Sequence, residues 1–275
     1  MVPARILTGL VLALALAGCA ASTDAPAPVQ STRDPTPSPT ATATVHADPG
    51  PRPKVGECHA LSWRQAVAPE AQVDPVRCAE PHTAQTYAVG RLDLDGRESG
   101  TLAVDSARVQ QRVQRTCAER LPRHLATTPR ELRLTMAQPV WFTPSAEQVE
   151  AGASWFRCDV VVVAAARKLL RLPTRTTGSG ASAAIAMCAT AEPGTPGFAR
   201  VTCGRKHSWV AVETVDLLAA KRPGAQQVQS RMDPVCRDAA RSRAGDPLDF
   251  SWSQESPTPE QWAAGQRYGI CWAPS

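Results

Sequence analysis

The segment PTPEQWAAGQRYGIC, Pro257 to Cys271, follows the same pattern as an earlier segment, PSAEQVEAGASWFRC, Pro144 to Cys158. In both, the first proline and the cysteine lie 14 residues apart, and a Glu-Gln pair and a glycine fall in register between them. Because chance rarely aligns so many positions, the two segments indicate two copies of one supersecondary unit.

Each copy of this segment predicts a short helix, a turn and a strand. Ser145 and Thr258 suit N-cap positions, and the glutamine three residues after each completes a capping box. Gly152 and Gly265 stand where a left-handed residue would end the helix. The runs that follow, SWFRCDVVVV and RYGICWA, have strand composition, and each carries a cysteine.

A longer amphipathic helix is expected before each segment. The first has apolar residues four apart that form a core-facing stripe, namely Val109, Val113, Cys117 and Leu121. The second keeps a similar stripe, namely Val228, Met232, Cys236 and Ala240. The pair Asp233-Pro234 has the features of an N-cap and a first helical residue, so a kink or two short helices are expected there. Strands are expected over residues 85–94 and 134–142, the latter interrupted by Pro139.

The cysteines indicate a disulfide framework in an exported chain. Cys19 stands alone, and the other eight divide four and four: Cys58, Cys78, Cys117, Cys158, then Cys188, Cys203, Cys236, Cys271. If each copy closes on itself, a few pairings remain for each. The expected placements let each helix cysteine meet the closing strand, Cys117 with Cys158 and Cys236 with Cys271. Cys58 with Cys78 and Cys188 with Cys203 would tie each opening strand to its neighbour.

The N-terminus is expected to anchor the chain to a membrane. Residues 1–18 have the anatomy of a signal peptide, and their apolar stretch is too short to span a bilayer. The sequence LAGC at residues 16–19 resembles the lipobox of bacterial lipoproteins, which implies cleavage before Cys19 and its acylation. Residues 19–53 are rich in Pro, Ser, Thr and Ala and are expected to form a disordered tether.

The fold class expected for the remainder is α+β, with two tandem disulfide-bonded repeats. Each repeat would be a small, mostly antiparallel sheet with packed helices. The boundaries are residues 54–166 for the first repeat, 167–182 for a linker rich in Pro, Gly and Ser, and 183–275 for the second repeat.

The charged and titratable residues argue against several functions. A net charge of +5 without a run of basic residues gives little support for nucleic-acid binding. His82 and His207 each follow a cysteine by four residues, but a disulfide-bonded cysteine cannot ligate zinc, so these imidazoles are expected to hydrogen-bond a turn. His59 and His124 are expected at the surface. Neither a metal nor a cofactor is predicted.

Recognisable catalytic constellations are missing from the sequence. Asp93 and Asp216 recur in register and could orient the two histidines, but strand-end aspartates at turns are the commoner explanation. Glu147 and Glu260 could pair for glycan hydrolysis, although first-turn helix positions favour acids anyway. Six tryptophans that could stack on wall sugars are more often core residues: Trp141, Trp155, Trp209, Trp252, Trp262 and Trp272.

The pattern resembles the septum-formation domain of actinobacterial envelope lipoproteins, in two tandem copies. The matching residues are Val55 to Cys58, Val76 to His82, Cys117, and the closing Trp262, Gly265, Arg267 and Cys271. The resemblance implies a link to cell division and no catalytic chemistry. The first copy has Val149 and Ser154 where the second has Trp262 and Arg267, so a binding role of these two positions would differ between the copies.

These observations together predict a non-enzymatic protein, anchored by lipid to the outer face of the cell membrane. It would bind an envelope protein or a cell-wall polymer, and two rigid copies on one tether could engage two sites at once. The alternatives are a cell-wall-acting hydrolase and a glycan-binding module with an unrecognised site.

Overall fold

The computed structural model describes residues 48–68, 70, 73–96, 101–176 and 184–275. All of these residues belong to one compact unit. The expected signal peptide, Cys19 and the tether up to residue 47 lie outside the described residues. Within the described ranges, no helix combines the length and the apolar character that a membrane crossing requires.

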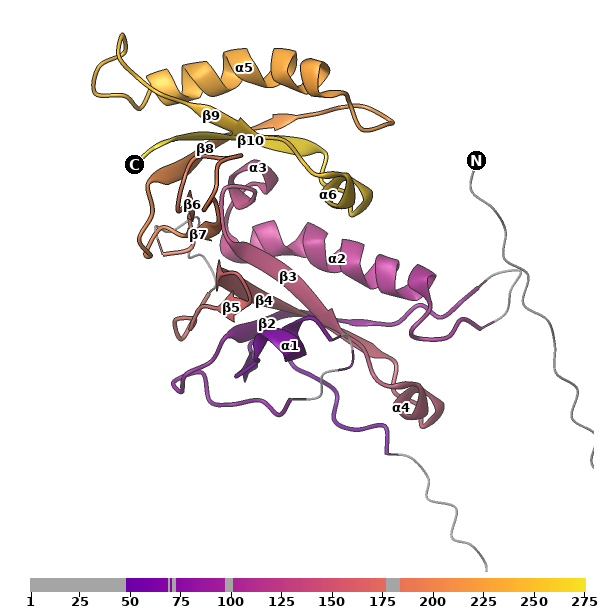
Figure 1. Cartoon of the computed structure of the whole chain (residues 1–275). Coiled ribbons are helices and arrows are strands. Elements are labelled where there is room, and N and C mark those ends of the chain that lie inside the picture. The colour runs from indigo at the N-terminus through magenta and orange to yellow at the C-terminus, as the bar shows by residue number, and fades with distance from the viewer. Residues whose placement is uncertain (1–47, 69, 71–72, 97–100, 177–183) are drawn as a thin grey trace, which may run out of the picture. The chain divides into compact units, whose positions relative to one another are not determined.

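The first half of this unit is an antiparallel sheet in the order β1-β2-β4-β3, with the short β5 added to β4. The helix α2 lies against this sheet (Figure 1). The elements are β1 (Cys58–His59), α1 (Trp63–Ala66), β2 (Ala84–Arg91), α2 (Ala107–Leu125), α3 (Pro129–Leu132), β3 (Ala137–Phe142), α4 (Ala146–Glu150), β4 (Trp155–Ala165) and β5 (Lys168–Leu169).

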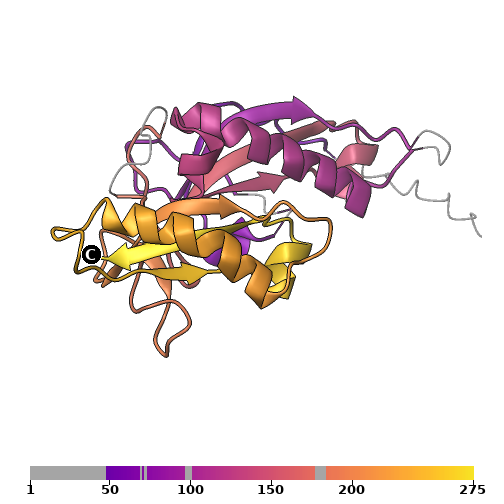
Figure 2. The same ribbon diagram turned by 90° about the horizontal axis from the view of Figure 1, so that it is seen from above.

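The second half is an antiparallel sheet in the order β7-β6-β8-β10-β9, and α5 lies along β8 and β10 (Figures 1 and 2). The elements are β6 (Met187–Ala189), β7 (Arg200–Thr202), β8 (Trp209–Asp216), α5 (Ala225–Arg241), β9 (Ser253–Glu255), α6 (Pro259–Ala263) and β10 (Tyr268–Pro274). The α+β class is therefore confirmed.

The two halves place corresponding elements in the same order. The path β1-β2-β4-β3 matches β6-β8-β10-β9. A long helix precedes β3 and β9, and a short helix precedes the closing strands β4 and β10. The four disulfides are those expected: Cys58–Cys78, Cys117–Cys158, Cys188–Cys203 and Cys236–Cys271. Each disulfide lies within one half, so the halves are held to each other without a covalent cross-link of this kind among the described residues.

The two repeated segments, residues 144–158 and 257–271, form the short helices that their capping residues predict. Ser145 and Thr258 accept hydrogen bonds from the backbone N–H groups of Gln148 and Gln261, and both capping boxes are complete. Gly152 and Gly265 adopt positive φ angles of 104° and 100°. A Cβ atom at either glycine would meet nothing within 4 Å, so the backbone angle and not crowding favours glycine there.

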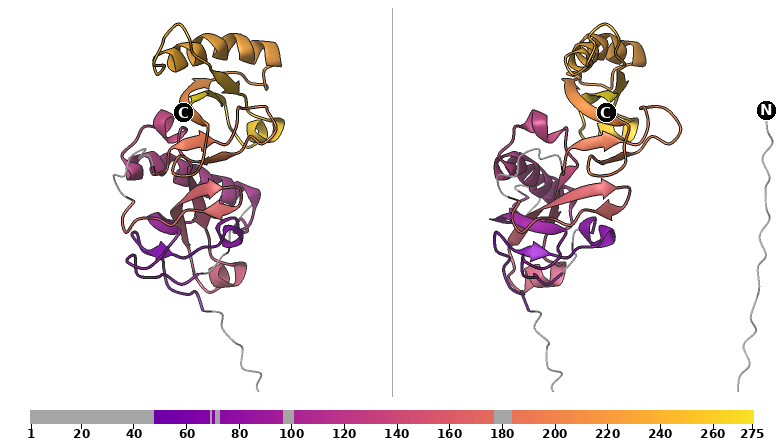
Figure 3. Two further views of the ribbon diagram at one scale, coloured as in Figure 1. Left: turned by 60° about the vertical axis from the view of Figure 1, so that its left-hand side comes forward. Right: turned by 90° about the vertical axis from the view of Figure 1, so that its left-hand side faces the viewer.

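The main hydrophobic core runs through both halves. The expected stripe of α2 is buried, and it packs in one cluster with β4 residues and with residues of the second sheet, including Ile185, Met187, Ile270 and Trp272. Backbone pairing also crosses the boundary, because Met136 N–H donates to the Ile185 carbonyl (2.7 Å) and Met187 N–H donates to the Leu134 carbonyl (2.9 Å). The two sheets form separate layers, with α5 on the side away from the first half (Figure 3).

Two short helices around Pro234 and a strand interrupted at Pro139 were expected, and both expectations are wrong. The second long helix is continuous from Ala225 to Arg241 with Pro234 inside it. Pro234 is exposed, while Met232 and Cys236 beside it are buried and Cys236 is cross-linked to β10, so packing outweighs the local cost of proline. Pro139 does not interrupt its strand either. It lies inside β3, which pairs only with β4 and so can tolerate a residue that lacks an N–H.

Part of the segment expected as a linker, residues 167–182, packs against the first half. Lys168 and Leu169 pair with β4, and the Leu172 N–H donates to the His82 carbonyl at 2.9 Å. The Gln85 side chain accepts hydrogen bonds from the Thr176 N–H at 3.0 Å and from its hydroxyl at 2.5 Å. Residues 168–176 therefore pack as part of the first half, and residues 177–183 lie outside the described residues.

Candidate functional site

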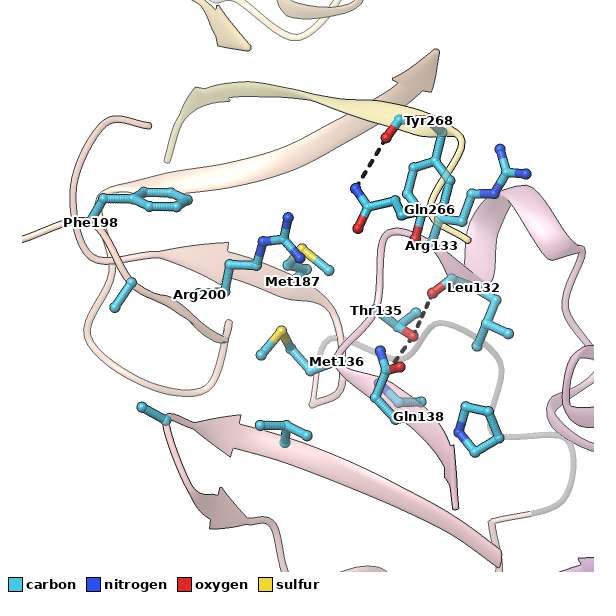
Figure 4. A pocket seen from close by; sticks show the side chains of 15 residues that line it. Leu132, Arg133, Thr135, Met136, Gln138, Met187, Phe198, Arg200, Gln266 and Tyr268 are labelled. Carbon is cyan, nitrogen blue, oxygen red and sulfur yellow. Dashed lines mark hydrogen bonds between the residues drawn. The ribbon is translucent and has the colours of Figure 1, made fainter. Parts of the chain in front are cut away.

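A groove of about 660 Å³ lies where the two halves meet. Its floor and walls come from α3, β3 and β4 of the first half and from β6, β7 and β10 of the second. Figure 4 shows side chains from both halves facing this space. Most of them are apolar or aromatic, including Leu132, Met136, Met187, Phe198 and Tyr268.

The groove contains two arginines, and both are neutralised by acids. Arg133 pairs with Asp216 at 2.6 Å, and its guanidinium lies 4.3 Å from the centroid of the Tyr268 ring. Arg200 makes two hydrogen bonds to Glu255, at 3.1 Å and 2.8 Å. Burial is the main cause that raises the pKa of Tyr268, so its hydroxyl is present as a neutral donor. The groove therefore presents an apolar surface with fixed polar groups at its sides.

The remaining polar groups at the groove are amides. Gln138 is exposed on the edge strand β3, and Gln266 donates through Nε2 to the Tyr268 carbonyl at 3.1 Å. Among the described residues that line this groove, none has a carboxylate, an imidazole or a thiol side chain. These chemical groups suit hydrogen bonds to a peptide backbone and burial of apolar side chains, and they do not form an acid–base pair.

The histidines that the sequence singles out both support a turn. His82 Nδ1 donates to the Glu80 carbonyl at 2.9 Å, and His207 Nδ1 donates to the Arg205 carbonyl at 2.7 Å. His82 is almost fully buried, whereas His207 is partly exposed. The two histidines lie in different halves. Within the described ranges, no group of three His, Cys, Asp or Glu residues is arranged to hold a metal ion.

Trp262 and Arg267 lie together as structural residues of the second half. Trp262 is buried in the cluster beneath α5, and the Arg267 guanidinium stacks 4.2 Å from the centroid of its ring. Arg267 also donates to the Trp262 carbonyl, and its own carbonyl accepts from the Leu217 N–H at 2.7 Å. This pair closes the turn between α6 and β10.

One family model, described as septum formation, matches residues 55–271. The chain belongs to the septum-formation family. This single match spans both halves, and membership of the family indicates a role related to cell division. A search of the curated proteins and a search of the solved structures gave no match.

This member of the septum-formation family contains a buried polar network that the sequence analysis missed. His59 is completely buried, and not at the surface as expected. Its Nδ1 donates to the Val73 carbonyl at 3.1 Å, and its Nε2 lies 3.3 Å from the Thr86 hydroxyl. Thr86 donates to Asp159 Oδ1 at 2.7 Å, and Asp159 Oδ2 lies 3.3 Å from Arg157 Nε.

The network is a structural feature and not a site that a substrate can reach, because each of its side chains is 7% exposed or less. Burial is the first cause that lowers the pKa of His59 and raises the pKa of Asp159. The signal in the sequence is Asp159 itself. A carboxylate inside the apolar run CDVVVV must find a buried partner.

The second half shows that the fold can do without this network. The register of the sheets places Ala189, Ala211 and Trp272 where the first half has His59, Thr86 and Asp159. All three are buried and belong to one hydrophobic cluster. The same backbone arrangement thus holds a polar core in one half and an apolar core in the other.

The other candidate residues are structural as well. Asp93 and Asp216 pair with Arg112 and Arg133, so neither orients a histidine. His124 is partly buried, with Nε2 2.8 Å from the Thr176 hydroxyl, which corrects its expected surface position. The six tryptophans are buried or pack against a hydrophobic cluster, as the core interpretation predicts: Trp141, Trp155, Trp209, Trp252, Trp262 and Trp272.

Proposed function

We propose that this protein is a lipid-anchored, non-enzymatic component of the cell envelope that acts in septum formation by binding another envelope protein. Cys19 would carry the lipid, and the described unit would stand on the outer face of the membrane at the end of its tether. Membership of the septum-formation family supports the division role. The complete leader ending in LAGC supports the anchor.

We also propose that the two halves arose as tandem copies of one unit. The shared strand order, the equivalent disulfides and the two matching helix-turn-strand segments support this origin. The binding surface would then belong to neither copy alone, because the groove takes side chains from both.

The groove between the halves is the observation that carries the binding function. Its apolar side chains can bury a hydrophobic segment of a partner. Its two arginines already pair with acids of this chain, so the partner would not have to supply carboxylates to neutralise them. Gln138 and Gln266 can hydrogen-bond the backbone of an extended segment beside the edge strand β3. A cell-wall hydrolase would instead need titratable groups that converge in the cleft.

Site-specific photo-crosslinking in dividing cells tests this proposal. A photoreactive amino acid replaces Gln138 or Gln266 in the groove, and in the control variant it replaces Arg237, which is exposed on α5. The expected result is one discrete crosslinked protein from both groove positions, enriched at the septum, and none from Arg237. The same crosslinks from all three positions, or none from the groove during septation, would contradict binding there.

A second variant links the groove to division. Tyr268→Ser removes the aromatic ring that stacks under Arg133. Thiol quantification on the purified, unreduced variant checks that its disulfides have formed and that it still folds. We expect elongated cells with delayed septa when this variant replaces the wild type. If the variant loses the crosslink but its cells keep the wild-type length, binding in the groove is not required for division.

The anchor is tested by metabolic labelling with a clickable fatty acid. The wild-type chain should take up the label and fractionate with membranes, while Cys19→Ser should do neither. Equal labelling of the two would contradict acylation at Cys19.

A further inference from the structure

A second pocket, of about 600 Å³, gathers basic side chains from both halves. Lys168 comes from the hairpin formed by β4 and β5, and Arg205, Lys206 and His207 come from the turn between β7 and β8. The β5 hairpin and this turn lie beside each other (Figure 1). The described residues that line the pocket include no Asp or Glu. Lys168 and Arg205 lie more than thirty residues apart in the sequence, so only the fold brings the hairpin and the turn together.

The three cations of this pocket have no ion-pair partner among the described residues. Lys168, Arg205 and Lys206 are all exposed, so they are free to move toward a ligand. Three unpaired positive charges around one concave surface repel each other, and an anion that binds there removes this repulsion.

The corresponding turn in the first half shows that the turn itself does not require this charge. Both turns follow a disulfide-bonded cysteine, and both are closed by a histidine that donates to the carbonyl two residues before it. The first turn has Glu80 and Pro81 where the second has Arg205 and Lys206. Glu80 moreover neutralises Arg77 at 2.7 Å. The same backbone thus carries opposite charge in the two halves.

The basic turn is also held rigidly. Cys203 is bonded to Cys188, its N–H donates to the Ala186 carbonyl at 3.0 Å, and the Ser208 N–H donates to the Ala189 carbonyl at 2.9 Å. His207 uses Nδ1 inside the turn, which leaves Nε2 as the ring nitrogen available to a ligand. A fixed backbone lowers the entropy cost of ordering the basic side chains around an anion.

We propose that this pocket binds a phosphate group, presented as a phosphodiester by an anionic polymer or lipid of the cell envelope. Arg205 supplies a planar guanidinium that can make two parallel hydrogen bonds to phosphate oxygens, and Lys168 and Lys206 supply point charges on either side. This site is separate from the groove that binds a protein in the proposed function, and its test does not depend on that function.

The four lysines of the chain allow an internally controlled test. Lys168 and Lys206 line the pocket, whereas Lys54 and Lys221 are exposed elsewhere and serve as references. The full chain in non-ionic detergent is briefly acetylated in phosphate or in chloride of equal ionic strength, and each lysine is quantified by mass spectrometry. We expect phosphate to slow acetylation of Lys168 and Lys206 several-fold and to leave the two references unchanged. Equal rates at all four lysines in both salts would overturn the proposal.

A charge-reversed variant with a matched control tests whether the turn between β7 and β8 causes the protection of Lys168 by phosphate. Arg205→Glu/Lys206→Pro gives this turn the residues of the first half, so it should fold, and phosphate should no longer protect Lys168 in it. Arg231→Gln/Arg237→Gln removes two exposed arginines from α5 and should leave the protection intact. Persistent protection of Lys168 in the first variant, with the references unchanged, would contradict the site.

Two further probes distinguish the sources of the phosphate group. Soluble polyglycerol phosphate represents a wall polymer, and phosphatidylglycerol added to the detergent micelles represents a lipid headgroup. Protection by the first probe assigns a polymer, and protection by the second assigns the membrane. Protection by inorganic phosphate alone would contradict a phosphodiester ligand. Failure of all three probes would overturn the proposal.

Discussion

At the scale of single residues, buried hydroxyl groups differ sharply in their hydrogen bonding. Thr86 lies in β2 with its hydroxyl between His59 and Asp159, whereas Thr214 lies in β8 with a buried hydroxyl that has no hydrogen-bond partner. Both threonines are 3% exposed or less. They form a matched pair of sites at which the same substitution has opposite expected effects.

We expect Thr86→Val to lower the free energy of unfolding by about 1–3 kcal/mol, because it leaves the buried Asp159 carboxyl without the hydroxyl that donates to it. Thr214→Val should be neutral or stabilising, since it replaces an unsatisfied hydroxyl by a methyl group of similar size. Guanidinium unfolding without reductant measures both. Equal losses in the two variants would mean that the Thr86 network contributes nothing specific.

A pH-dependent contribution is expected from His124. Burial lowers its pKa, so the folded protein prefers the neutral ring, which packs 5.4 Å from the Tyr87 ring and faces the Thr176 hydroxyl. A lowered pKa means that this stability is present above the unfolded pKa of about 6.5 and is lost as the pH falls.

The advantage of the wild type over His124→Gln should therefore shrink as the pH is lowered from about 7.5 to about 5. Glutamine keeps a hydrogen-bonding group for Thr176 but does not titrate. Unfolding curves at constant ionic strength measure the difference. Parallel stability profiles for the two proteins would show that His124 takes up its proton equally in the folded and unfolded states.

At the scale of secondary structure, the long helices each contain a proline that local propensity disfavours. Pro234 is exposed within α5, and Pro122 is buried within the last turn of α2. In both helices the buried stripe and a disulfide to the closing strand hold the helix in place. Tertiary contacts therefore offset the unfavourable free energy of each proline within its helix.

We expect Pro234→Ala to raise the free energy of unfolding by about 2 kcal/mol, because alanine restores a helical hydrogen bond and removes a steric clash. Part of the gain is offset because proline also restricts the unfolded chain. Pro122→Ala should gain less, since it removes a buried ring. Thermal unfolding of the two variants tests this, and a larger gain from Pro122→Ala would contradict it.

At the scale of the whole molecule, the two halves behave as one body. The core continues from α2 and the first sheet into Met187, Ile270 and Trp272 of the second. Two ion pairs also cross the boundary, Arg130 with Glu213 at 2.8 Å and Arg133 with Asp216 at 2.6 Å, but both are partly exposed to solvent and add little stability. The halves therefore share one core and one groove.

Residues 48–176 and 184–275, expressed separately, should each fail to unfold cooperatively, because each exposes its side of the common core. Co-expressed, the two fragments should copurify without a covalent link, since every disulfide is internal to one half. Calorimetry and gel filtration under non-reducing conditions measure both results. A cooperative transition in either isolated fragment would show that the halves are independent domains.

The sequence by itself determined the parts of this protein that depend on local rules. Capping boxes, turn glycines, helical stripes and cysteine positions act over a few residues, and they predicted the short helices, the long helices and the four disulfides. The family followed from the same positions, because its motifs are mostly cysteines and turns.

Only the tertiary structure decided which side chains meet across long separations. His59 is buried because Thr86 and Asp159 reach it from other strands, and Pro234 remains helical because packing outweighs its propensity. The groove and the basic pocket each combine residues from both halves, which no periodicity within one segment can encode. Binding surfaces of this kind depend on how the layers pack, and the free energy of that packing is set by the whole core.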